Sequence, residues 1–131
     1  MSKTAIVADP VFKDHDTGPG HPERPERLDG IYSALEDAGL MAEAKRIGLR
    51  EAAEDELLWV HTKEHIERIK ATSGKDRMYM DGDTPTSKDS YRTALLAAGS
   101  LLEATAAVMK GDAKNALALV RPPGHHAESD R

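Results

Sequence analysis

The sequence predicts an α/β protein with a parallel sheet. Two short apolar runs, residues 4–10 and 117–120, have the length and composition of buried strands and lie near opposite ends of the chain. Between them, apolar residues recur at helical spacing. Strands separated by helices are typical of parallel sheets. Because two strands alone do not form a stable sheet, we expect further neighbours for both.

The composition and net charge exclude several classes of protein and of binding site. The 131 residues fit one domain, and the net charge of -5 without a Lys/Arg-rich run argues against nucleic acid as a partner. The absence of cysteine excludes disulfides and thiolate metal sites. No apolar run approaches the roughly 20 residues of a membrane span, and no signal segment precedes the first strand. We therefore expect a soluble, cytoplasmic protein with no membrane partner.

The first half of the chain begins with a strand. Residues 4–10 form it, and residues 11–24 are predicted as a loop because they are rich in Gly, Pro and Asp. Pro25 suits the first turn of a helix, and Gly39 lies where its C-terminal cap is expected. Residues 45–49 are predicted as a short strand or an extended connection.

Two short helices and a loop follow. Residues 54–60 favour the first helix, and Thr62 is a suitable N-cap for the second. His61 and His65 are four residues apart near this helix start, and we expect packing or surface roles for them. Residues 73–86 are polar and rich in turn formers, which predicts a surface loop.

The longest helix is predicted to begin at Ser87 or Ser90 and to end at Gly111. One stripe of this helix is expected to face the core. Its members are Tyr91, Ala94, Leu95, Ala98, Leu101, Leu102, Thr105, Val108 and Met109. A turn over residues 112–115 then leads into the buried strand at 117–120.

The strongest chemical signal is the pair His125 and His126. Ligands of open α/β sheets gather at the carboxyl ends of strands, and this pair follows such an end. Imidazole titrates near pH 6.5, so the pair can accept and donate a proton. Two prolines fix φ before them, and Gly124 permits a sharp turn. Alternatives are a turn with one capping and one solvated histidine, or metal ligation, although adjacent residues seldom fit one coordination sphere.

Weaker candidates carry carboxylates and one guanidinium. Asp81 and Asp83 are either turn formers or rim carboxylates that accept hydrogen bonds from substrate amides. Arg27, early in a helix, is either solvated or able to reach an anion. An irregularly spaced group could also suggest a metal-binding loop. Its members are Asp14, His15, Asp16 and His21.

Four motifs together resemble the histone deacetylase superfamily. They are His21-Pro22-Glu23-Arg24-Pro25-Glu26-Arg27-Leu28, Val60-His61-Thr62, Asp81-Gly82-Asp83-Thr84 and Arg121-Pro122-Pro123-Gly124-His125-His126-Ala127. The sequence is most similar to the bacterial branch, with its acetoin-utilisation-type and class II-like amidohydrolases. The resemblance implies a three-layer α/β arginase/deacetylase fold with a parallel sheet. It also implies zinc-dependent hydrolysis of an acetyl-lysine-like or other N-acylated amine.

The resemblance also implies roles for single residues. His126 would be the general base and then the acid that protonates the leaving amine, and His125 its electrostatic partner. Asp83, with Asp81 as the alternative, would be the rim carboxylate that holds the substrate backbone. Gly124 and Arg27 complete the candidate substrate-binding residues, with Arg27 beside the inner channel.

The family's zinc ligands lie downstream of the histidine pair, so we expect no metal ligand here. Residues 1–131 are therefore predicted to be the N-terminal part of a single deacetylase-like domain, inactive alone. Two alternatives remain. The chain could be an interaction module that completes its sheet by self-association or with a partner chain. It could also be a small metal-binding protein that uses His125 or His126 with Asp14, His15 or Asp16.

Overall fold

The computed structural model describes residues 3–131, and its main sheet has three parallel strands. β1 (Lys3–Ala8) lies in the centre, between the short β2 (Lys45–Arg46) and β5 (Ala113–Leu119). Ile6 pairs with Arg46 on one side and with Leu117 on the other. The predicted parallel α/β arrangement is confirmed. The predicted need for a further strand is met on one side by β2.

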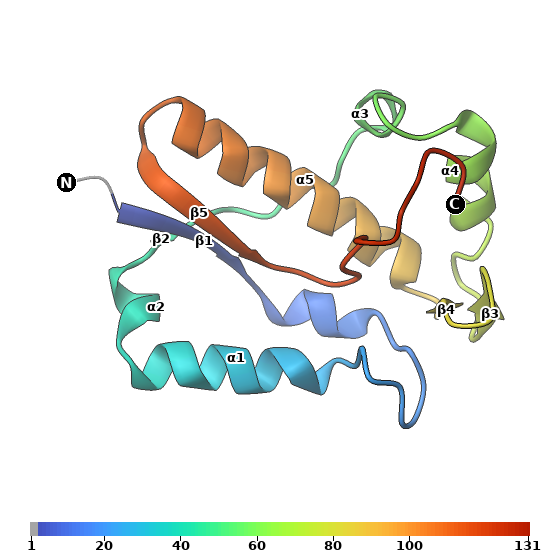
Figure 1. Ribbon diagram of the computed structural model, residues 1–131, viewed down its shortest axis with the longest axis horizontal. Coiled ribbons are helices and arrows are strands. Elements are labelled where there is room, and N and C mark those ends of the chain that lie inside the picture. Colours follow the sequence, from blue (N-terminus) through green and yellow to red (C-terminus); the bar gives the residue numbers. More distant parts are fainter. Residues whose placement is uncertain (1–2) are drawn as a thin grey trace.

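Helices cover both faces of this sheet (Figure 1). α5 (Ser90–Met109) packs along β1 and β5, and α1 (Glu26–Asp37) lies on the opposite side. The core between these layers joins both helices to β1 and to η1, a 3-10 helix at Pro10–Asp14. Its buried members are Val7, Phe12, Leu28, Leu96, Ala97 and Ala104. No helix within residues 3–131 has the length and apolar character to cross a membrane.

Helix boundaries follow the capping signals in the sequence. α1 begins directly after Pro25, and Gly39 adopts a left-handed φ of 73° after its end. Gly39 also precedes the short α2 (Leu40–Glu43). α3 (Glu54–Leu57) is shorter than predicted, whereas α4 (Lys63–Lys70) starts where the Thr62 side chain accepts a hydrogen bond from the His65 amide. The predicted C-cap and N-cap are confirmed.

Three segments predicted as turns or loops contain regular structure. The segment 73–86 includes β3 (Met78–Tyr79) and β4 (Pro85–Thr86), which pair antiparallel. The loop after the first strand contains η1, whose first turn is capped by Asp9. β5 starts at Ala113, inside the predicted turn. These elements are two to seven residues long, too short for a clear period in the sequence.

The predicted core-facing stripe of α5 is wrong. Leu101 and Met109 are 52% and 81% exposed, whereas a face of mostly small residues is buried. That face consists of Ser90, Thr93, Leu96, Ala97, Gly99, Ser100, Ala104 and Ala107. The reason is a close approach: a Cβ on Gly99 would lie 2.6 Å from the Ala52 nitrogen. Small side chains are what allow the segment 50–52 to cross the helix at this distance.

The last strand is also less buried than predicted. Residues 114–117 of β5 are exposed, with Leu117 at 45%, and residues 118–120 are half-buried. Within the described chain β5 is an edge strand, paired only with β1. An edge strand keeps one row of backbone groups unpaired, so its outer side is accessible.

Candidate active site

The histidine pair lies beyond the carboxyl end of β5, as predicted. The Tyr32 hydroxyl of α1 holds the ends of β1 and β5 together by hydrogen bonding to the carbonyls of Asp9 and Leu119, at 3.1 and 3.2 Å. The chain then bends at Pro122–Gly124, where the Arg121–Pro122 peptide bond is cis and Gly124 has a φ of 71°. The predicted sharp turn is therefore present at Gly124.

His125 and His126 occupy a tight turn closed by a hydrogen bond from the Ala127 amide to the Gly124 carbonyl. Both side chains are exposed, and their ring centroids lie 4.2 Å apart in an edge-to-face arrangement. Two imidazoles at this distance can exchange a proton with a molecule placed over them.

Arg121 anchors the base of this turn. Its guanidinium is completely buried and forms a two-pronged ion pair with Glu23, at 2.7 Å from Nε to Oε1 and 2.8 Å from Nη2 to Oε2. Nη1 also donates to the carbonyls of Phe12 and His15. Burial alone would raise the pKa of Glu23, but Arg121 and then Arg27 hold it below its ordinary value. The ion pair therefore joins the first and last of the four motifs.

The first motif also contacts the third. The His21 Nε2 atom lies 3.5 Å from Oδ1 of Asp83. The Asp83 side chain is otherwise almost fully exposed, at 95%. Arg27, on the first turn of α1, is half-exposed and forms a 3.0 Å ion pair with Glu23. Glu23 is thus shared by the buried Arg121 and the accessible Arg27.

Asp81 and Asp83 differ in how their carboxylates are used. One oxygen of Asp81 accepts hydrogen bonds from the Asp83 amide and the Thr84 hydroxyl, both at 2.8 Å. These bonds, the amide first, lower the pKa of Asp81. Asp81 therefore closes the turn between β3 and β4, and Asp83 is the carboxylate that extends away from it.

The second motif holds the segment that follows the histidine pair. His61 Nδ1 lies 2.8 Å from the Glu128 carbonyl, and the Thr62 amide donates to the Ser129 carbonyl at 2.8 Å. The His61 and His65 rings are 5.1 Å apart, so they share one side of the α4 start. His61 therefore helps to fix the segment after the histidine pair. The sequence predicted a packing or surface role for it but not this contact.

The structure also contains a buried Ser–His–Glu arrangement that the sequence did not predict. His15 is 6% exposed, with Nδ1 2.7 Å from the Ser90 hydroxyl and Nε2 3.9 Å from Glu23. Burial first, and then the charge of Arg121, lowers the pKa of His15 to about 4, so the imidazole is neutral at pH 7. Ser90 is itself buried and accepts a hydrogen bond from the Ser87 amide, so we assign this group a structural role.

The proposed metal-binding loop is not assembled. Within residues 3–131, no cluster of three or more His, Asp or Glu side chains could hold a metal ion. The alternative that combines His125 or His126 with Asp14, His15 or Asp16 is therefore wrong for this structure.

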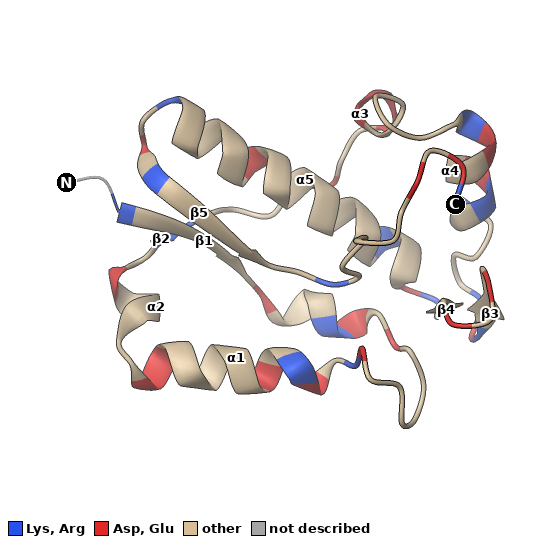
Figure 2. Ribbon diagram, viewed as in Figure 1, with Lys and Arg blue, Asp and Glu red and all other residues tan. Residues whose placement is uncertain are grey.

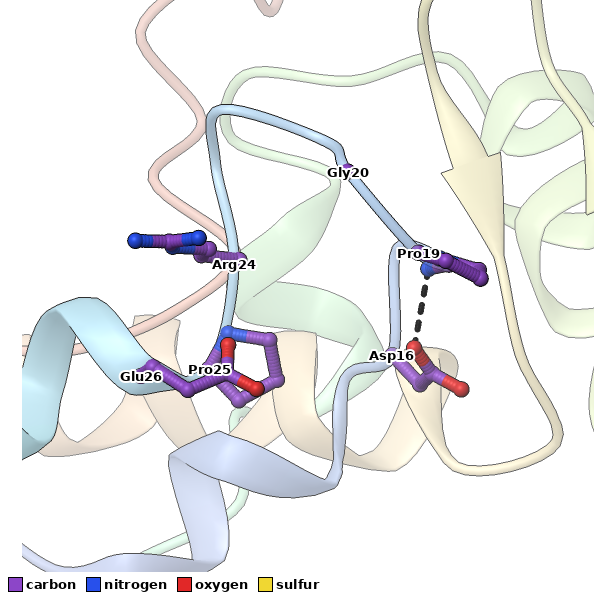
Figure 3. Close-up of a pocket in the computed structure, with 7 residues that line it drawn as sticks. Asp16, Pro19, Gly20, Arg24, Pro25 and Glu26 are labelled. Atoms are coloured by element: carbon purple, nitrogen blue, oxygen red, sulfur yellow. Dashed lines mark hydrogen bonds between the residues drawn. The ribbon is translucent and has the colours of Figure 1, made fainter.

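Two shallow pockets lie beside the first motif. One of about 300 Å³ is formed by the loop from Asp16 to Glu26, where Asp16 accepts a hydrogen bond from the Gly18 amide (Figure 3). The other, of about 380 Å³, lies between the segments 14–16, 76–77 and 87–89. Asp14 and Asp16 of the candidate metal-binding group line these pockets, but neither pocket includes His125, His126 or the other predicted catalytic and substrate-binding residues.

Comparison with known proteins explains why these motifs converge. Residues 21–131 match the family described as "Histone deacetylase domain". The chain belongs to the histone deacetylase family.

Individual relatives agree with this assignment. Histone deacetylase HDA1 of Candida albicans is 38% identical over 126 residues, covering 82% of this chain and 15% of that protein. Polyamine deacetylase HDAC10 of Danio rerio is 39% identical over 114 residues, covering 81% of this chain and 17% of that protein. The crystal structure of the HDA15 HD domain superposes with a TM-score of 0.95 at 38% identity, over 100% of this chain and 39% of that one.

The predicted family and fold are thus confirmed, and the described chain is a fragment of the histone deacetylase fold. It spans less than two fifths of the length of these relatives. These relatives come from a fungus, a fish and the bacterium Pseudomonas aeruginosa, so they do not single out a bacterial branch.

Proposed function

We propose that this chain supplies the histidine-bearing part of a site that hydrolyses an N-acylated amine, such as acetyl-lysine. The observation that supports this proposal is that two other motifs contact the chain on either side of the histidine turn. Arg121 before the turn bonds to Glu23, and the segment after it bonds to His61 and Thr62. Residues from distant parts of the sequence thus gather around the histidine turn, as expected if they serve one shared site.

His125 and His126 would move the protons of this reaction. Amide hydrolysis requires a base for the attacking water and an acid for the leaving amine, and one imidazole can serve both in turn. We assign these roles to His126 and assign electrostatic support to His125. Their exposure and their 4.2 Å separation are compatible with both rings facing one substrate.

Asp83 is the better candidate for the rim carboxylate. The carboxylate of Asp81 is occupied by its own turn, whereas that of Asp83 is 95% exposed beside His21 and can accept hydrogen bonds from substrate amides. Gly124 would let a substrate approach the backbone, because it has no side chain beside the turn. Arg27 would lie on the inner side, where Glu23 orients its guanidinium.

Zinc dependence is part of this proposal, but the residues described here do not fit a zinc site. The ion would need ligands that residues 3–131 do not supply. We therefore expect the 131-residue chain alone to be inactive. We also propose that it is the N-terminal part of a single deacetylase-like domain.

The substrate class is an acylated amine, and the relatives' names include both histone and polyamine deacetylases. Nucleic acid is not an expected partner. Lys and Arg are interspersed with Asp and Glu along the described chain (Figure 2), and the net charge is -5. The compartment that we expect is the cytoplasm.

Zinc content and hydrolysis of an acetyl-lysine peptide and of an acetylated polyamine test this function. They are measured on the 131-residue chain and on the longest product of its gene. The proposal expects zinc and turnover in the longer product only. Stoichiometric zinc with turnover in the 131-residue chain would contradict the proposed division of the site, and a zinc-free, inactive longer product would contradict deacetylation itself.

A second candidate function is self-association or partner binding through the outer edge of β5. The observation in its favour is the exposed stretch 114–117 on an edge strand. Sedimentation of the 131-residue chain over a hundredfold concentration range tests it. Dimers abolished by Leu117→Lys would support this candidate, and a monomer throughout would exclude self-association.

A further inference from the structure

All three nitrogens of the Arg121 guanidinium donate hydrogen bonds to the protein. Four hydrogen bonds of 2.7–3.0 Å link it to the Glu23 carboxylate and to two backbone carbonyls, and the side chain has no exposed surface. A charge-assisted, two-pronged pair fixes the orientation of the guanidinium as well as its position. Arg121 is therefore among the most constrained side chains of the fold.

These bonds connect three separate segments. Glu23 lies in the first motif, Phe12 is in η1, and His15 follows η1. Arg121 itself begins the last motif, four residues before His125. One side chain thus fixes the start of the histidine turn to η1 and to the first motif, both in the connection between β1 and α1.

The link from Arg121 to the histidines is short and stiff. Pro122 and Pro123 each have a fixed φ, and the turn from Gly124 to Ala127 is hydrogen-bonded. Of the described residues, none hydrogen-bonds to either imidazole of the pair. Within this part of the chain, the backbone of the turn therefore determines where the two rings lie. The hydrogen bonds of Arg121 in turn fix the start of that backbone.

We propose that Arg121 and Glu23 are positioning residues that hold His125 and His126 in register for catalysis, an inference that rests on the proposed hydrolytic function. Arginine is required rather than lysine, because only the planar fork can bond the carboxylate and both carbonyls together. If the pair only stabilised the fold, breaking it would lower the free energy of unfolding. It would not change the relative position of the two histidine rings in the folded protein.

The first test follows the rings by NMR in the 131-residue chain. At a centroid distance of 4.2 Å, the C–H protons of the two imidazoles give a cross-ring NOE. Arg121→Lys is expected to abolish that NOE while the backbone amides of β1 and α1 keep their shifts. The matched control is Arg50→Lys, since Arg50 also forms a two-pronged pair, with Glu56, away from the histidine turn. It should leave the NOE intact.

Should Arg121→Lys not fold, Glu23→Gln provides the same comparison, with Glu56→Gln as its control. The amide keeps the shape of the carboxylate but cannot accept both guanidinium bonds. Loss of the ring NOE in Glu23→Gln supports positioning. A full NOE in a folded Arg121→Lys or Glu23→Gln variant overturns it.

The second test uses kinetics in the longest product of the gene. A displacement of about 1 Å at a catalytic group reduces turnover on the order of 100-fold. We expect Glu23→Gln to lower kcat by that factor, with a smaller change in KM through its contact with Arg27, and Glu56→Gln to change neither. Equal kcat values for both variants would overturn the proposal. Absence of activity in the wild-type protein would instead overturn the proposed function, and the NMR result would then decide the positioning role by itself.

Discussion

Two arginine–glutamate pairs of similar chemistry hold two different junctions of this fold. Arg121 and Glu23 join the histidine turn to the first motif, with the arginine fully buried. Arg50 and Glu56 join the segment before α3 to its first turn, and Arg50 also contacts Glu103 on α5, with 37% of its side chain exposed. Similar geometry does not imply similar energetics, because water screens the exposed pair and is excluded from the buried one.

The two junctions therefore depend on different things. The Arg121 junction depends on charge, since removing Arg121 leaves the largely buried Glu23 with only the accessible Arg27 as partner and leaves two buried carbonyls without their donor. The Arg50 junction depends on shape, because its backbone crosses α5 at Gly99, where a side chain has no room.

The largest expected effect is on stability. Arg121→Ala should lower the free energy of unfolding by about 3–5 kcal/mol, as expected when one member of a buried pair is removed. Arg50→Ala should cost clearly less, because its carboxylate partners are accessible to water. Urea unfolding of both variants measures the difference. Equal losses would mean that burial does not distinguish the junctions.

Acid should weaken the buried junction first. His15 is held neutral with a pKa of about 4 in the fold and titrates near 6.5 when unfolded, so the unfolded chain binds more protons between these values. Stability present above pH 6.5 is thus lost as the pH falls to 4, by on the order of 3 kcal/mol. Glu23, with its lowered pKa, continues the loss below its ordinary range.

The check is urea unfolding from pH 7.5 to 4 for the wild type and for His15→Asn, which cannot titrate there. The variant should lose much less stability over this range. The Arg50 junction should lose stability only at the acid end of this range and below it, because Arg50 and then the Ala53 amide lower the pKa of Glu56 from 4.5 to about 2. Parallel curves for the two proteins would refute the role of His15.

A smaller effect is expected at the shape-dependent junction. Gly99→Ala would place a Cβ 2.6 Å from the Ala52 nitrogen and 2.7 Å from the Glu51 carbonyl carbon, so backbone has to move. Overpacking of this kind costs about 1–3 kcal/mol. Gly30→Ala, in the exposed middle of α1 with open space around it, should instead stabilise by about 0.5–1 kcal/mol. Thermal unfolding of both variants distinguishes the two signs.

The contrast between the junctions also shows what the sequence could and could not predict. The alternation of strands and helices, the caps at Gly39 and Thr62 and the position of the histidine turn follow from local signals, and they were predicted correctly. Four motifs were enough to predict the family. These features depend on neighbouring residues along the chain.

What was missed depends on contacts between distant segments. The Arg121–Glu23 pair joins residues 98 positions apart, and no pattern near either residue indicates it. The stripe of α5 was assigned from the helical spacing of its apolar residues, but the close crossing at Gly99 selects the face with small residues. β5 was predicted as buried from its apolar composition, and composition alone does not say how many neighbours a strand has in the described chain.

The most direct test of the central claim is the turnover of His126→Ala in the longest product of the gene, with an acetyl-lysine peptide as substrate. Loss of a general acid–base group typically lowers kcat by about 100- to 10,000-fold. We predict a loss in that range, and wild-type kcat for Lys110→Ala, an exposed substitution beyond the far end of α5. Wild-type turnover by His126→Ala would contradict the claim that this turn carries the proton-transfer group of the site.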